Sequence, residues 1–187
     1  MAKINFKKGL TDIVLYIIIF IVVQIFLTYA GAGIWAAVKG EGYQATLLAM
    51  GTGNNAILTA LTTVFSNVIT LIIFLKAKWT PLTRNYLQSK PWISLLWVAL
   101  FTLGAIIPLE FVYEQIGVEM DADTERVFAS LMKEPWGYVA IGILAPLAEE
   151  IVFRGAILRT LLDMVSKKNH WVAIFISAAA FGLIHGN

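Results

Sequence analysis

Two adjacent glutamates, Glu149 and Glu150, lie in the middle of a membrane-length apolar run. A charged group at the centre of a bilayer costs about 2.5–3.5 kcal/mol on insertion scales, so acids at this depth indicate a functional site. Glu150 and Arg154 are four residues apart, the spacing at which a carboxylate and a guanidinium meet on one helix face. Because neighbouring helical residues point about 100° apart, we expect this pair to orient the site and Glu149 to project into a cavity as a general base.

A second candidate group lies in the next apolar run, where Phe181 and His185 are four residues apart. Glu149 and His185 each fall about 13–14 residues from the same end of their predicted helices, or roughly 20 Å at 1.5 Å per residue. Two antiparallel helices joined by a short connection are neighbours, so the carboxylate and the imidazole are expected to converge on one water molecule or substrate group. Small residues at Gly155, 178–180 and Gly182 would permit close helix approach.

These two patterns, Glu149-Glu150-x-x-x-Arg154 and Phe181-x-x-x-His185, resemble the first two motifs of the CPBP (Abi) family of intramembrane proteases. That family includes CAAX-prenyl endopeptidases and bacteriocin-processing enzymes. The resemblance implies hydrolysis of a peptide bond within or beside the membrane, with Glu149 activating water and the other four residues completing the two motifs. The implied substrates are prenylated CAAX-type tails, or bacteriocin, pheromone or other short membrane-bound peptides.

Members of the resembled family carry a third motif, a histidine followed four residues later by Asn or Asp, on a later helix. The sequence stops at Asn187, two residues after His185, and neither of its two histidines supplies that motif. We therefore interpret residues 1–187 as one transmembrane domain and as a fragment of a longer chain, the alternative being a natural truncation without activity. Reading the gene beyond Asn187 for a further apolar span with this motif would separate the two interpretations.

The sequence leaves metal dependence open. His170 and His185 lie on one predicted helix about 22 Å apart, so they cannot share an ion whose ligand bonds are about 2 Å long. His185 with a carboxylate falls short of the three protein ligands of a usual catalytic zinc site. The resembled family is often labelled metalloprotease, while a glutamate-activated water without metal has also been argued for it. The absence of cysteine excludes disulfides, thiolate ligands and a cysteine nucleophile.

The elements that must position these residues are membrane helices. The chain is 59% hydrophobic and 14% charged, against roughly 45–50% and 25% in soluble domains, which predicts an all-α, polytopic transmembrane bundle. Five spans are expected at 13–38, 56–75, 92–113, 137–162 and 171 to the end, the last incomplete. The first is interpreted as a retained anchor, because it exceeds the 7–15 apolar residues of a signal peptide. Pro146 predicts a kink or local opening before the glutamates.

Basic residues are concentrated in alternate connections, while the opposite ones are mainly acidic, which predicts that the N-terminus lies in the cytoplasm. The residues concerned are Lys3, Lys7 and Lys8, then Lys76, Lys78, Arg84 and Lys90, and finally Lys167 and Lys168. We expect an integral membrane protein, of the plasma membrane of a bacterium. Aromatic residues at span ends, among them Trp79, Trp92 and Trp171, are expected to anchor the interfaces. Gln24 and Asn67 are expected to form hydrogen bonds between helices. We expect a peptide or lipidated-protein substrate and no nucleic-acid partner; the oligomeric state is open.

Two other classes of function fit the same features. A noncatalytic membrane protein of the same fold, with an immunity or scaffold role, is favoured by the missing third motif. A transporter or proton relay also places acids at the bilayer midplane, but such proteins usually show repeat symmetry between their halves. The same reading of the gene beyond Asn187 separates the first of these from the protease hypothesis.

Overall fold

The computed structural model describes residues 5–80, 92–117 and 121–185, and for His185 only the backbone. Lys3, Arg84, Lys90 and the side chain of His185 therefore lie outside the described residues. Within those ranges the chain is helical and has no strand, so the protein is an all-α membrane protein as the composition predicts. Three of its helices are long and apolar enough to cross a bilayer: Phe6–Lys39, Ala56–Lys76 and Trp92–Ile116.

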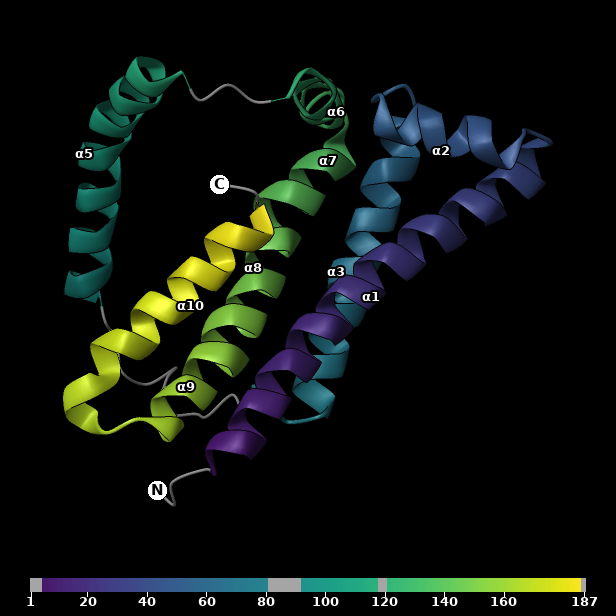
Figure 1. The fold of residues 1–187 in the computed structure, drawn as a ribbon. Helices are drawn as coiled ribbons and strands as arrows, with labels where there is room; N and C mark the ends of the chain where they lie inside the picture. The colour runs from purple at the N-terminus through teal and green to yellow at the C-terminus, as the bar shows by residue number, and fades with distance from the viewer. Residues whose placement is uncertain (1–4, 81–91, 118–120, 186–187) are drawn as a thin grey trace.

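The first two of these long helices, α1 (Phe6–Lys39) and α3 (Ala56–Lys76), pack side by side (Figure 1). Each begins at an asparagine whose side chain accepts a backbone N–H of the first turn: Asn5 from Lys7, and Asn55 from Leu58 at 3.2 Å. An asparagine at this position satisfies one of the N–H groups that a helix start leaves without a partner. α1 ends at Gly40, whose φ of 68° is the left-handed conformation that glycine adopts without steric cost.

Two short helices at the end of the bundle opposite the N-terminus were not among the predicted elements (Figure 1). α2 (Tyr43–Gly51) joins α1 to α3, and α6 (Ala122–Leu131) precedes the glutamate-bearing helix. The sequence does carry a signal for α6, because Asp121 accepts the N–H groups of Asp123 and Thr124 as a helix N-cap. The close approach of Gly53 to the α6 backbone then ties α2, α3 and α6 together at that end.

The glutamates lie on a continuous helix, 135–164, that passes between α3 and the last helix. It begins with Pro135 at its first turn in α7 (Pro135–Val139), where a missing N–H is harmless. It widens to a π-helix in η1 (Ala140–Leu144) and again in η2 (Glu150–Leu158), with α8 (Ala145–Glu149) between them and α9 (Arg159–Met164) after them. Pro146 lies in the first turn of α8, so the predicted local opening takes the form of a π segment directly before it.

The chain then turns through η3 (Lys167–Asn169) into α10 (His170–His185), which runs antiparallel to the 135–164 helix (Figure 1). The main core forms where α1, the end of α3, η2 and α10 meet. It contains Ile13, Tyr16, Phe20, Phe74, Val152, Phe153, Ala156, Ile157, Leu161 and Ala173. This core lies directly beside the glutamate and arginine positions of η2.

α5 (Trp92–Ile116) stands apart from the other helices, on the far side of α10 from α1 and α3 (Figure 1). None of its residues is buried. The helix contains Pro108 and the acid Glu110, neither of which the sequence analysis singled out. An apolar helix of 25 residues is long enough to span the hydrocarbon layer of a membrane.

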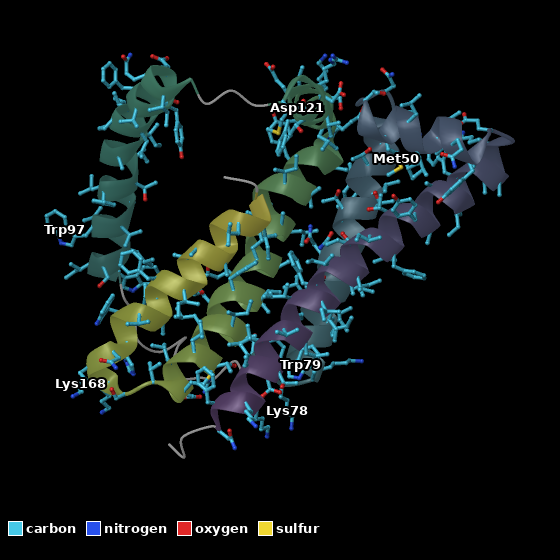
Figure 2. All side chains as sticks on the ribbon, in the orientation of Figure 1. Met50, Lys78, Trp79, Trp97, Asp121 and Lys168 are labelled. Atoms are coloured by element: carbon cyan, nitrogen blue, oxygen red, sulfur yellow. The ribbon has the colours of Figure 1, made fainter. Side chains whose placement is uncertain are left out.

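The ring of Trp79, one of the expected interface anchors, contacts side chains of α1 and α3. The indole is half-buried and packs against Tyr16 and Phe74, with ring centroids 5.1 Å and 5.2 Å away (Figure 2). Trp92 and Trp171, by contrast, are largely exposed, and their role as interface anchors stays a prediction. Trp79 therefore serves to fix the chain that leaves α3 against α1.

Candidate functional site

The predicted pair of Glu150 and Arg154 is present, with Arg154 Nη1 2.9 Å from Glu150 Oε2. The side chains of Glu150 and Arg154 are 59% and 54% exposed, so the described residues do not bury the pair. The pair lies on the surface of η2 that adjoins α10. The two residues are four positions apart on one helix face, and this spacing alone explains the contact.

Phe181 of α10 joins the second motif to this pair. The Arg154 guanidinium carbon lies 5.5 Å from the centroid of the Phe181 ring, within the range at which an aromatic face attracts a cation. The Phe181 ring also meets Phe153 edge-on, with centroids 5.1 Å apart. Phe153 is almost fully buried and contacts Phe20 of α1 on its other side, at 6.1 Å. The structure thus brings the two motifs together through a cation and a chain of rings that ends in the core.

Glu149 is half-buried at the end of α8 and takes part in an interaction with its surroundings, as does Phe181. It does not line the cavity that the described residues form beside it. That cavity, of about 150 Å³, lies between η2 and α10 and is lined by Phe153, Arg154, Leu158, Ile174, Ser177, Ala178 and Phe181. Arg154 therefore faces this cavity, and the projection of Glu149 into a cavity stays a prediction.

The contact between Phe153 and Phe181 relates the backbone position of His185 to that of Glu149. α10 runs antiparallel to the 135–164 helix, and Phe181 is opposite Phe153. From that contact, His185 is four residues further along α10, and Glu149 is four residues back along the other helix. Because the two helices are antiparallel, one turn forward along α10 and one turn back along the other helix lead in the same direction. The backbone positions of His185 and Glu149 therefore lie at about the same level of the two helices.

Two hydroxyl groups from neighbouring elements reach backbone carbonyls of η2. The Thr80 hydroxyl, from the chain that leaves α3, donates to the Ile151 carbonyl oxygen at 2.8 Å. The Ser177 hydroxyl of α10 donates to the Phe153 carbonyl at 3.4 Å, the long limit of such a bond. Gly155 was expected to let α10 approach, but the group against its Cα is the Thr80 side chain. Neither hydroxyl was predicted, because no motif or spacing marks a threonine 71 residues from its partner.

The described residues do not form a metal site. Among them, no three His, Asp or Glu side chains lie close enough together to hold an ion. Of the two carboxylates near the cavity, Glu150 is already paired with Arg154. These residues provide the carboxylate of Glu149 at the level of the His185 backbone, and the guanidinium of Arg154 one turn further along the same helix as Glu149.

Comparison with known proteins supports the reading of the motifs. The family model described as type II CAAX prenyl endopeptidase Rce1-like matches residues 131–187, the segment that holds both motifs. The chain is also similar to "Putative membrane peptidase YdiL" of Bacillus subtilis (strain 168), with 26% identity over 126 residues. That alignment covers 64% of this chain and 50% of the relative, so the chain spans about half the length of that protein. No solved structure matches the chain.

Proposed function

Because residues 131–187 carry the Rce1-like segment of the type II CAAX prenyl endopeptidases, we propose that the protein is an intramembrane endopeptidase in which Glu149 activates water. Its substrate is a membrane-associated peptide, either a prenylated CAAX-type tail or a short membrane-bound peptide such as a bacteriocin or pheromone precursor. Glu150 and Arg154 orient the site, Phe181 supports Arg154, and His185 acts with Glu149.

The observation that carries the proposal is the position of the Arg154 guanidinium. It bonds Glu150 of the first motif at 2.9 Å and lies over Phe181 of the second at 5.5 Å. Packing between the two helices alone would not require a cation between the two motifs. Here the cation fixes the turn of η2 that follows Glu149 against the turn of α10 that precedes His185. The two groups proposed to react are therefore held on adjoining turns.

The proposed reaction uses Glu149 as the general base. Glu149 accepts a proton from a water molecule while the water oxygen attacks the carbonyl carbon of the scissile peptide. The carbon–nitrogen bond then breaks, and the proton held by Glu149 passes to the leaving amine.

The test is cleavage by the protein reconstituted in vesicles, with a farnesylated CAAX peptide and an unlipidated membrane-anchored peptide as substrates and mass spectrometry of the products. Glu149→Gln should lower kcat by about 10²- to 10⁴-fold, the usual contribution of a general base, and leave the protein folded. His185→Ala should match it. Glu150→Gln and Arg154→Ala should leave partial activity, since they remove orientation rather than the base.

Glu134→Gln is the matched control, because Glu134 precedes the same helix and its side chain caps none of the helix's N–H groups. It should cleave as the wild type does. Wild-type cleavage by a folded Glu149→Gln variant would overturn the assignment of the base. If no variant and no wild-type protein cleaves either peptide, the noncatalytic role of the same fold becomes the better account.

The orientation in the membrane is part of the proposal. We place the N-terminus and the turns around Lys78 and Lys167 in the cytoplasm of a bacterial cell, on the distribution of basic residues and the bacterial source of the similar peptidase. The chain has no cysteine, so single introduced cysteines give an unambiguous labelling map. Labelling of a cysteine at position 167 by a membrane-impermeant maleimide in intact cells would overturn this orientation.

A further inference from the structure

Thr80 lies outside both motifs, yet its side chain contacts the helix that bears the first one. We propose that Thr80 is a positioning residue, which holds η2 so that the Glu150–Arg154 pair and the adjacent Glu149 keep their places in the site. The inference rests on the proposed function for its kinetic consequences. It rests on geometry alone for the contact itself.

The end of α3 delivers Thr80 to η2. The Trp79 N–H donates to the Phe74 carbonyl at 3.1 Å and the Lys78 N–H to the Leu75 carbonyl at 3.1 Å, the paired bonds of a Schellman motif. Lys78 occupies the left-handed position of that motif with a φ of 57°, where glycine is usual. Trp79 then packs between Tyr16 and Phe74. Thr80 is the next residue after this turn, so the capping bonds and the packing of Trp79 fix the position of its backbone.

Thr80 is seated against the glycine of η2. It is 7% exposed, and a Cβ at Gly155 would overlap its methyl group and lie 2.7 Å from its hydroxyl oxygen. The same hydroxyl donates to the Ile151 carbonyl at 2.8 Å. Shape and hydrogen bond therefore fix the same side chain, and only a residue without a side chain at position 155 admits it.

Thr80 contacts two residues of η2, and each of them is the next residue in the sequence after a member of the ion pair. Ile151 comes after Glu150, and Gly155 comes after Arg154. η2 is a π-helix, in which backbone bonding shifts from the fourth to the fifth residue along the chain. A hydroxyl that binds the Ile151 carbonyl from outside holds that widened turn in one rotational setting. Loss of the hydroxyl should let the turn rotate, which moves Glu150, Arg154 and the preceding Glu149 together.

Thr80→Val keeps the shape of the side chain and removes the hydroxyl, whereas Thr80→Ser keeps the hydroxyl and removes the methyl group. Cleavage kinetics of the reconstituted protein should show kcat lowered about tenfold in the valine variant, with KM and protein yield unchanged, and restored in the serine variant. A 1 Å misplacement of reacting groups can cost 10²-fold, so a tenfold loss corresponds to a smaller displacement. Thr70→Val is the matched control, because Thr70 is fully buried on α3 and its hydroxyl has no partner among the described residues.

Wild-type kcat in Thr80→Val would overturn the inference. An equal loss of kcat in the valine and serine variants, together with a reduced protein yield, would also overturn it. That result would mean that Thr80 contributes packing and not a positioning hydrogen bond. Hydrogen–deuterium exchange in micelles separates this inference from the proposed function. If the wild-type protein cleaves nothing, faster exchange confined to 150–158 in Thr80→Val still supports the positioning contact, and unchanged exchange refutes it.

Discussion

The polar contact between α1 and α3 allows a quantitative prediction that does not depend on function. The Gln24 amide lies between two polar side chains of α3. Its Nε2 donates to the Asn67 side-chain oxygen at 3.2 Å, and its Oε1 accepts the Ser66 hydroxyl at 2.6 Å. Ser66 and Asn67 are 1% and 3% exposed, so water cannot replace either bond. The structure thus confirms the role predicted for Gln24 and Asn67.

We expect Gln24→Leu to lower the free energy of unfolding by about 1–3 kcal/mol. Hydrogen bonds between membrane helices contribute about 0.6 kcal/mol on average and up to about 1.7 kcal/mol, and this substitution removes two of them. Ser66 keeps a second acceptor, the Thr63 carbonyl at 3.0 Å, which makes the lower half of the range the better expectation. Replacing both partners by apolar residues should recover part of the loss, because no polar group is then left unsatisfied.

The assay is equilibrium unfolding in mixed micelles, with Gln24→Leu, Asn67→Leu and the double variant forming a thermodynamic cycle. The coupling energy should be about 0.6–1.7 kcal/mol. Thr28→Val is the control, because its hydroxyl bonds the Gln24 carbonyl within α1 at 2.9 Å and reaches no other helix. It should change stability by no more than about 0.5 kcal/mol. A coupling energy within about 0.3 kcal/mol of zero would mean that the two amides do not hold the helices together.

Two further predictions concern the backbone. Lys78→Gly should raise the free energy of unfolding by about 1 kcal/mol, since a left-handed conformation costs an L residue about 1–2 kcal/mol. In thermal melts, Lys78→Gly should raise the melting temperature, whereas Lys76→Gly, inside α3, should lower it. A lower melting temperature for Lys78→Gly would contradict the cap geometry. Gly137→Ala should prevent accumulation in the membrane fraction, because the added Cβ would overlap the Leu131 backbone carbonyl. Gly104→Ala has no atom within 4 Å and should accumulate normally; equal amounts of both would refute the contact.

The sequence predicts the helices more completely than it predicts their partners. The apolar runs expected at 56–75 and 92–113 correspond to α3 at Ala56–Lys76 and α5 at Trp92–Ile116. The local pair of Glu150 and Arg154 was also predictable, because a separation of four residues fixes both ends on one helix face. Hydrophobicity and helical period are properties of the chain itself, so they can be read without knowledge of the fold.

Contacts that depend on the path of the chain were not predictable. Trp79 stands at a span end like the other aromatic residues, and only the Schellman turn after α3 directs it into the core. The exposure of Glu150 depends on which face of η2 the neighbouring helices cover, and no local pattern determines that face. The π segments follow from Pro146 only in part, since a proline predicts an opening but not its form.

The late position of the 135–164 helix in the chain has a consequence for the protein while it is being made. Synthesis produces α1 and α3 first, then α5, and only later the residues of the 135–164 helix that complete the core. The bond from Thr80 to Ile151 must wait for 71 further residues. During that interval the core cluster that contains Phe74 lacks its members from η2, among them Val152 and Phe153. The Gln24 contact closes over a shorter separation of 43 residues, so it is the one available to hold the nascent α1–α3 hairpin until the later helix arrives.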